Sequence, residues 1–232
     1  MKKVAEDKEQ NDEIEYKLIL LGDTSVGKTC LFKKITTGVF FDKNVSTIGI
    51  DRRTIKLQIN LEEKGKNISK NITLHLIDTA GEERFKALTK NYYKDADGAV
   101  LLYDITDNKT FEHVEEWIES IKNSNTNINS NNKFSILLLG TKIDLIEEGN
   151  KKRQVELEEA KRKCKEYDLE WGGECSNLTF TDEQYKEIFK EFIKIIYSRI
   201  GFKKTNSQSR YKLETKHSQK KANNCPCSIK PV

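Results

Sequence analysis

Residues 22–29, Gly-Asp-Thr-Ser-Val-Gly-Lys-Thr, have the spacing G-x-x-x-x-G-K-[ST]. They follow an apolar run at residues 18–21 and open a stretch, residues 28–37, with a helical pattern. A buried strand that delivers such a loop to a helix N-terminus turns successive backbone N–H groups toward the oxygens of a polyphosphate. A chance glycine-rich turn is the weaker alternative, because strand, loop and helix follow in order. The segment predicts a nucleoside triphosphate site in an α/β fold.

Two side chains of this loop carry specific chemistry. We expect Lys28 to reach the β- and γ-phosphates and the hydroxyl of Thr29 to ligate Mg²⁺. The predicted nucleotide-binding residues of the segment are Asp23, Thr24, Ser25, Val26, Gly27, Lys28, Thr29 and Cys30.

The composition indicates one soluble core with polar ends. The chain has 232 residues, of which 36% are hydrophobic, and this is enough for a single α/β domain. No apolar run approaches the roughly 18 residues that span a bilayer, and the charged N-terminus does not resemble a signal peptide. The five scattered cysteines suggest neither a disulfide framework nor a zinc site. We therefore expect a cytoplasmic protein.

Charge and pattern divide the chain into three parts. We expect a disordered tail at residues 1–14, a domain at residues 15–201 and a flexible basic tail at residues 202–232. The last part holds eight Lys or Arg residues and one Glu, so its net positive charge exceeds the +4 of the whole chain. A mildly acidic domain therefore carries a basic tail, and this favours an anionic partner for the tail.

The hydrophobic pattern predicts strands that alternate with helices. Residues 16–21 form a strand, and residues 50–61 and 72–77 form an antiparallel hairpin with an extended tip at residues 62–71. Residues 98–103 and 134–139 are continuous apolar runs, which is typical of strands buried on both faces of a parallel sheet.

The helices follow from apolar residues at helical spacing. One helix presents a stripe made of Phe111, Val114, Trp117, Ile118 and Ile121. A second helix covers residues 156–167. The last runs from a capping box at Thr181 and Gln184 to residue 200, with Tyr185, Ile188, Phe189, Phe192 and Ile196 facing the core. We read residues 123–132 as a solvated loop. The predicted fold is a doubly wound, mostly parallel sheet with one antiparallel edge hairpin, and ligands bind at the C-terminal ends of its strands.

Residues near the phosphate loop in this fold complete a metal site. Asp78 directly follows a strand, so its carboxylate can hold the water shell of Mg²⁺, and Gly81 can offer a backbone N–H to the γ-phosphate. Thr47 lies on an expected surface loop and would join the Mg²⁺ shell when a γ-phosphate orders that loop.

Two further loops select guanine. A carboxylate at Asp144 can accept from N1 and N2 of guanine, a pair of donors that adenine lacks, and the stem of Lys142 can lie on the ring face. Thr141 precedes them after the strand at residues 134–139. Backbone N–H groups after the last strand, at Ser176, Asn177 and Leu178, can face the base carbonyl.

These motifs, in this order, resemble the Ras-like small GTPases over residues 15–200. Within that superfamily the chain is most similar to the Rab branch, through the segments 46–51, 83–85, 92–96 and 102–106. The resemblance implies the small GTPase fold, GTP or GDP as ligand with Mg²⁺, and an aromatic edge at Phe40 against the guanine. Plain packing is the alternative reading of Phe40.

Glu82 departs from the family pattern D-T-A-G-Q-E, in which glutamine orients the attacking water. A carboxylate only accepts hydrogen bonds and repels the anionic γ-phosphate, and Thr24 crowds the same region, so we predict slow intrinsic hydrolysis. Alternatively, Glu82 turns to solvent and an activating partner supplies the missing groups, since an arginine finger alone contributes about 10³ to 10⁵ in rate. The predicted catalytic residues are Lys28, Thr47, Gly81 and Glu82.

Other departures concern the base and the effector surface. Thr141 replaces the usual Asn of N-K-x-D, and the T-K-x-D and E-C-S-x-L-T segments resemble Rho-type relatives. Asn177 and Leu178 stand where Rab proteins carry Ala and Lys. Arg52 and Ile77 replace aromatic residues at positions that Rab effectors read, so we expect unusual partners.

The C-terminal tail bears on the membrane. Cys225 and Cys227 resemble a Rab prenylation pair, although proline separates them and five residues follow. Two lipids give stable anchoring, and the basic residues add attraction to an anionic leaflet. An unmodified tail with two free thiols is the alternative.

The resemblance implies a switch that regulates vesicle traffic on the cytosolic face of intracellular membranes. Its expected partners are an exchange factor, a GTPase-activating protein, effectors at Thr47 and residues 81–89, and a membrane surface. We expect a monomer and no nucleic-acid partner. The rival reading is a scaffold that holds GTP with negligible hydrolysis, and an ATP-dependent enzyme fits residues 22–29 but not Asp144.

Overall fold

A computed structural model describes residues 14–40, 50–63, 65–79, 96–124 and 134–201. The expected tails, the loops with Thr47, Gly81 and Glu82, most of the polar loop at 123–132, and Cys225 and Cys227 therefore lie outside the described residues. Within the described ranges, every helix is too short or too polar to cross a lipid bilayer.

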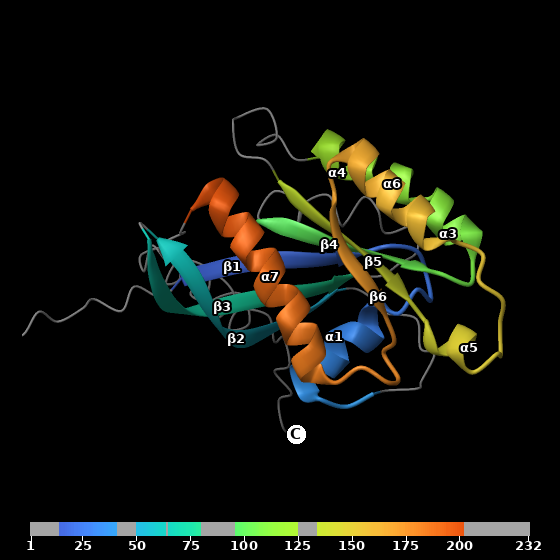
Figure 1. Ribbon diagram of the computed structural model, residues 1–232, viewed down its shortest axis with the longest axis horizontal. Coiled ribbons are helices and arrows are strands. Elements are labelled where there is room, and N and C mark those ends of the chain that lie inside the picture. The colour runs from blue at the N-terminus through green and yellow to red at the C-terminus, as the bar shows by residue number, and fades with distance from the viewer. Residues whose placement is uncertain (1–13, 41–49, 64, 80–95, 125–133, 202–232) are drawn as a thin grey trace, which may run out of the picture. The chain divides into compact units, whose positions relative to one another are not determined.

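Six strands of the described chain form one sheet in the order β2-β3-β1-β4-β5-β6 (Figure 1). Only β2 and β3 pair antiparallel, and all other pairs are parallel, which confirms the predicted fold class. The strands are β1 (Ile14–Leu21), β2 (Ile50–Glu63), β3 (Lys66–Thr79), β4 (Gly98–Asp104), β5 (Ser135–Thr141) and β6 (Glu170–Cys175).

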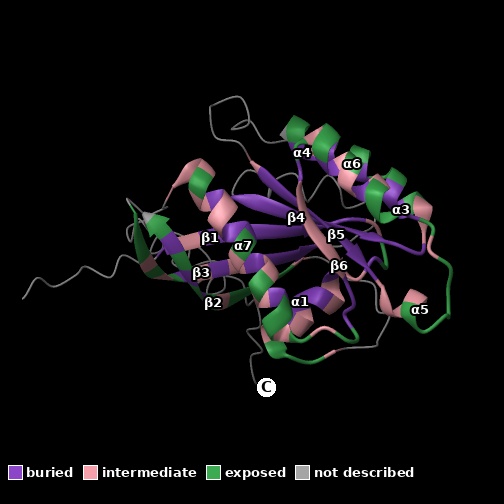
Figure 2. Ribbon diagram, in the orientation of Figure 1, coloured by how far each residue is buried: buried purple, intermediate pink, exposed green. Residues whose placement is uncertain are grey.

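Helices cover both faces of this sheet. They are α1 (Lys28–Thr37), α3 (Asn108–Glu112), α4 (Val114–Ser124), α5 (Asp144–Glu147), α6 (Leu157–Tyr167) and α7 (Asp182–Ile200). The apolar residues of α1 and α7 join one core cluster, and those of α3, α4 and α6 join a second, so the sheet separates two cores. The buried strands run between these helices (Figure 2).

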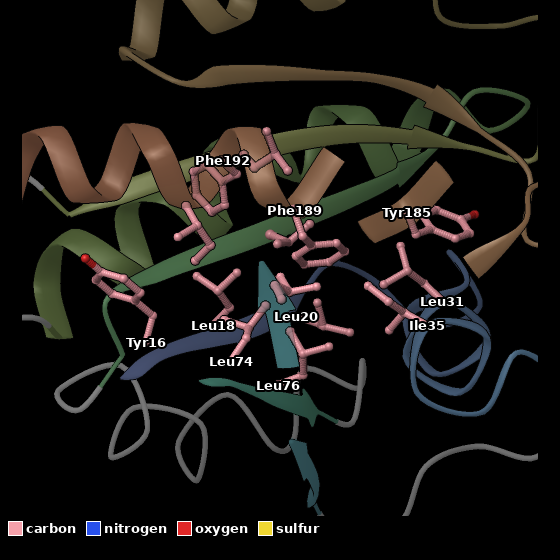
Figure 3. Packing of buried hydrophobic residues seen from close by; sticks show 14 of the residues in the cluster. Tyr16, Leu18, Leu20, Leu31, Ile35, Leu74, Leu76, Tyr185, Phe189 and Phe192 are labelled. Atoms are coloured by element: carbon pink, nitrogen blue, oxygen red, sulfur yellow. The ribbon is translucent and has the colours of Figure 1, made fainter. Parts of the chain in front are cut away.

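The central strand β1 shows how one strand serves both cores. Leu18 and Leu20 point into the cluster with α7, whereas Ile19 and Leu21 point into the cluster on the other face. Figure 3 shows Leu18 and Leu20 packed with Phe189 of α7. A strand buried on both faces reads as a continuous apolar run, which is the pattern that predicted it.

Several boundaries differ from the prediction. Ile14 already belongs to β1, because it is buried and pairs with Ile72, so this strand begins two residues earlier than the expected strand at 16–21. The expected extended tip at residues 62–71 is wrong: the ladder continues to Glu63 and Lys66, and Gly65 at φ 73° lies in the short turn. Leu61 is buried and pairs with Ile68, so the ladder extends past the predicted strand end at residue 61.

The helical predictions also needed adjustment. The helix predicted from the stripe 111–121 is divided at His113, although all five stripe residues are buried. The capping box of α7 is confirmed, since Thr181 and Gln184 bond each other's backbone N–H at 3.2 and 2.8 Å. Ile193 joins the core face of α7, whereas Ile188 is only partly buried.

Candidate functional site

The loop between β1 and α1 has a backbone that requires glycine at both of its ends. Gly22 has φ 130°, and a Cβ there would lie 2.3 Å from the carbonyl oxygen of Leu102. Gly27 has φ 99°, and a Cβ there would lie 2.6 Å from Nδ2 of Asn177. Because both positions need positive φ and close approach, the two glycines of the motif hold the loop's curvature.

Lys28 is the charged centre of this loop. It is only 5% exposed, and its Nζ donates to the carbonyl oxygens of Gly22 and Asp23 at 2.9 and 2.5 Å. Burial lowers the pKa of Lys28 to about 8, while the negative charges of Asp78 and Asp23 oppose this shift. A buried ammonium that is only partly compensated favours an anionic ligand, because further negative charge restores its protonated form.

Thr29 and Asp78, the two described residues for which a role at Mg²⁺ is predicted, meet beside this lysine. The Thr29 hydroxyl donates to Oδ2 of Asp78 at 2.7 Å, across 49 residues of chain. Asp78 is 1% exposed, and burial raises the pKa of its carboxyl, opposed by the Thr29 hydrogen bond and the Lys28 charge. Its Oδ1 is buried and has no hydrogen-bond partner among the described residues.

The Thr29–Asp78 pair fits a magnesium ion. Hydroxyl and carboxylate oxygens are the ligands that Mg²⁺ prefers, and the ion usually keeps several of its waters. The orphaned Oδ1 of Asp78 is an acceptor that a metal-bound water would satisfy.

The loop after β5 touches the phosphate loop. The Thr141 hydroxyl lies 2.8 Å from the carbonyl oxygen of Val26 and 2.9 Å from that of Tyr103, and Thr141 is fully buried. Lys142 adopts φ 69°, and its Nζ pairs with Oδ2 of Asp104 at 2.7 Å. This pair fixes the direction of the Lys142 stem. Asp144 begins the short helix α5 and is partly exposed.

The loop after β6 lies against the loop after β5. The backbone N–H of Ile143 donates to the carbonyl of Cys175 at 3.3 Å. Ser176 is fully buried, and its Oγ accepts from the backbone N–H groups of Leu178 and Thr179 at 3.1 Å each. Asn177 is 8% exposed, and its amide spans from Gly27 to α7. The three predicted loops therefore converge at one edge of the sheet.

Some contacts of the site were missed at the sequence level. The carboxylate of Asp23 accepts from Nε1 of Trp117 at 2.8 Å and contacts Nδ1 of His113 at 2.5 Å. Arg153 makes a bidentate pair with Glu174, at 2.6 and 2.8 Å. The one available signal was Trp117 itself, since a buried indole N–H usually finds an acceptor.

Other predicted residues take less defined places. Phe40 is half-buried and comes after the end of α1. Leu178 is exposed and Cys30 is half-buried. Glu174 and Cys175 of the E-C-S-x-L-T segment are the last two residues of β6.

Apart from Phe40, which comes after α1, the predicted residues that the structure describes lie at or just after the C-terminal ends of β1, β3, β5 and β6 (Figure 1). Asp78 and Thr141, which were expected to follow their strands, are still part of β3 and β5, because the ladders continue to Thr79 and Thr141. This is the edge at which open α/β sheets bind ligands. The buried lysine, the oxygen pair at Thr29 and Asp78 and the two loops after β5 and β6 suit a nucleotide with its polyphosphate and metal.

Comparisons with known proteins agree with this geometry. The model of the Ras family matches residues 17–198. The chain is 35% identical to the Ras-related protein Rab-13 of Rattus norvegicus, over 92% of this chain and 96% of the relative. It is 34% identical to the Ras-related protein RABA5c of Arabidopsis thaliana, over 91% and 89%. It is 40% identical to the Ras-related protein Rab-19 of Xenopus laevis, over 62% and 60%. The chain therefore belongs to the Ras family and is a Rab-type small GTPase, a GTP-hydrolysing enzyme of membrane traffic.

Proposed function

We propose that this protein is a guanine-nucleotide switch that binds GTP with Mg²⁺, hydrolyses it slowly to GDP and phosphate, and binds effectors in the GTP form. The observation that carries the proposal is the Thr29–Asp78 pair beside the buried ammonium of Lys28. An orphaned carboxylate oxygen, a hydroxyl and a buried cation together suit a metal–polyphosphate.

The chain's own groups bind and orient the phosphates. The backbone N–H groups of residues 23–30 and the N-terminus of α1 face the phosphate oxygens, and Lys28 turns from Gly22 and Asp23 toward the β- and γ-phosphates. Thr29 and Thr47 would hold Mg²⁺ and Asp78 would hold its water shell. When bound, the ion would neutralise charge that develops on the transferred phosphoryl group. Gly81 donates its backbone N–H to the γ-phosphate.

The base is selected by the loops after β5 and β6. Asp144 accepts from N1 and N2 of guanine, and the stem of Lys142 covers the ring from a position fixed by Asp104. The backbone N–H groups of Ser176 and Asn177 face the base carbonyl, whereas that of Leu178 donates to Oγ of Ser176. Phe40 lies at the ring edge. GTP, and not ATP, should therefore displace a fluorescent GDP analogue, and Asp144→Ala should weaken that preference. Equal competition by ATP would contradict this assignment.

Glu82 sets the rate of hydrolysis in this proposal. An ionised carboxylate accepts from the attacking water but cannot donate toward the phosphoryl oxygens, and it repels them. We expect slow intrinsic turnover that a GTPase-activating partner accelerates. The second candidate, a scaffold that holds GTP without turnover, rests on the same glutamate together with Thr24.

Single-turnover phosphate release from GTP-loaded, Mg²⁺-bound protein tests this role. We expect Glu82→Gln to release phosphate faster than the wild type. Glu83→Gln is the matched control, because it makes the same change of charge at the next residue. Equal, readily detected rates in wild type and Glu82→Gln would contradict slow hydrolysis and the scaffold alike.

Effectors and membranes complete the proposed cycle. GTP orders the loops around Thr47 and residues 81–89, and effectors bind that surface together with the exposed Arg52 of β2. The basic tail and Cys225 and Cys227 bring the protein to the cytosolic face of an intracellular membrane. Cys225→Ser with Cys227→Ser should shift the protein from the membrane fraction to the cytosol. An unchanged distribution would contradict lipidation.

A further inference from the structure

We propose that Asn177 and Tyr185 are a positioning pair that ties the base loop to the phosphate loop and slows nucleotide release. The inference rests on the proposed nucleotide site, and it adds Tyr185 and a role for the side chain of Asn177. Nδ2 of Asn177 donates to the carbonyl oxygen of Gly27 at 3.1 Å, and its Oδ1 accepts from the hydroxyl of Tyr185 at 2.9 Å. One amide therefore connects three elements.

The contact with Gly27 falls at a sensitive point of the phosphate loop. Gly27 is the N-cap of α1, and its carbonyl also accepts the backbone N–H of Leu31 at 2.9 Å. Asn177 supplies a second donor to that carbonyl, from a side chain that is 8% exposed. A Cβ on Gly27 would lie 2.6 Å from Nδ2, so the amide sits directly against the loop. Movement of either loop must break this bond.

Tyr185 gives the amide a rigid support. It lies in the first turn of α7, is fully buried, and follows the capping box at Thr181. Figure 3 shows its ring beside Leu31 and Ile35 of α1, with which it shares a core cluster. Burial raises the pKa of the Tyr185 hydroxyl far above its usual value, so the hydroxyl stays protonated and keeps donating. The orientation of the Asn177 amide is thereby set.

Release of a nucleotide requires both loops to open. The Rab-type pattern has alanine at this position, and a methyl group can neither donate to Gly27 nor accept from Tyr185. In this chain the backbone at residue 177 faces the base while its side chain holds the loop that faces the phosphates. The pair therefore couples the two ends of the ligand and adds to the barrier for its release.

Three variants test the pair through the rate of release of a fluorescent GDP analogue from Mg²⁺-loaded protein. Asn177→Ala should release it about fivefold faster, since one buried hydrogen bond contributes roughly 1 kcal/mol. Asn177→Asp keeps the shape of the side chain and the acceptor for Tyr185, but it places an acceptor oxygen against the Gly27 carbonyl. We therefore expect it to release the analogue at least as fast as Asn177→Ala does. Tyr185→Phe should accelerate release in the same direction.

A double variant separates positioning from general stability. Asn177→Ala with Tyr185→Phe should release no faster than Asn177→Ala alone, because Tyr185 acts through the asparagine. Tyr16→Phe is the matched control: the Tyr16 hydroxyl donates to the Gly201 carbonyl at 2.7 Å, so its loss should lower the melting temperature without changing release.

The outcomes distinguish the inference from the function on which it rests. A wild type that retains GDP, with unchanged release in Asn177→Ala and Asn177→Asp, would overturn the inference alone. Acceleration by Tyr16→Phe equal to that of Tyr185→Phe would also overturn it, because general destabilisation would then explain the effect. A wild type that fails to retain GDP would overturn the proposed function and the inference together.

Discussion

The indole Nε1 of Trp117 donates to Oδ1 of Asp23 at 2.8 Å, across 94 residues of chain. The other carboxylate oxygen contacts His113, at the junction of α3 and α4. A residue of the phosphate loop is thus held by helices on one face of the sheet, while Asn177 holds the opposite end of the same loop at Gly27. The loop is therefore held from two directions.

Trp117→Phe tests the first of these anchors. The change keeps an aromatic ring in the core but removes the N–H donor, so the free energy of unfolding should fall by about 1 kcal/mol. GDP release should be a few-fold faster. Trp171→Phe is the matched control, because Trp171 belongs to β6 and no described contact joins it to the phosphate loop. Equal release rates in the two variants would contradict an anchoring role for Trp117.

Metal removal tests the Thr29–Asp78 pair. Chelation by EDTA should accelerate GDP release from the wild type by about tenfold or more, because a Lewis-acid cation contributes several kcal/mol of charge stabilisation. Asp78→Ala should already release rapidly in Mg²⁺ and respond little to EDTA. The exposed Asp168→Ala serves as the control and should behave like the wild type. A strong EDTA response in Asp78→Ala would assign the metal to other residues.

Loss of the hydroxyl should have opposite effects on protein stability at two buried tyrosines. The Tyr103 hydroxyl has no hydrogen-bond partner among the described residues, and burial raises its pKa. Tyr103→Phe should therefore be neutral or stabilising, by up to about 1 kcal/mol. Tyr16→Phe loses its bond to Gly201 and should be destabilising by about the same amount. Thermal unfolding of GDP-loaded protein measures both, and destabilisation by Tyr103→Phe would reveal a partner for that hydroxyl.

Two cysteines should resist alkylation in the native protein. Burial raises the pKa of Cys164 to about 11 and that of Cys175 to about 12. Only the thiolate reacts, so at pH 8 iodoacetamide should leave both unmodified while the unfolded protein reacts fully. Mass spectrometry of tryptic peptides measures the alkylation of each cysteine.

The same shifts predict loss of stability at high pH. In the folded protein the pKa values of Cys164 and Cys175 lie above the ordinary value of 9. The stability that the two protonated thiols contribute is therefore complete below pH 9 and is lost as the pH rises toward 11 and 12. Rapid labelling of Cys164 and Cys175 by iodoacetamide in the native protein at pH 8 would show that these thiols become accessible, and would contradict their predicted resistance to alkylation.

The sequence predicted the elements best where local pattern and burial coincide. The run at residues 98–103 is a strand buried on both faces, and Thr181 with Gln184 forms the expected cap. The phosphate loop was predictable because its chemistry depends on spacing within a few residues. The length of the β2–β3 hairpin was not predictable, because its polar residues have the composition of a turn although they pair from Leu61 and Ile68 to Glu63 and Lys66.

Contacts between distant residues account for what was missed in the site. The sequence pattern places Trp117 in an apolar stripe, and the fold also makes it a donor to Asp23. The sequence predicts a role for the backbone of Asn177, and the fold brings its side chain beside α7 and Gly27. Residue type suggested each donor, but only the tertiary fold identified its acceptor.

The hydroxyl of Thr141 has one proton and two carbonyl oxygens within reach, those of Val26 and Tyr103. The asparagine usual at this position has two amide protons and could serve both at once. Here the phosphate loop and strand β4 compete for a single hydrogen, so the proton can alternate between them by rotation about one bond. The hydrogen bond that holds the phosphate loop in this chain is therefore shared with β4. Any change that moves Tyr103 also alters how often Thr141 donates to Val26.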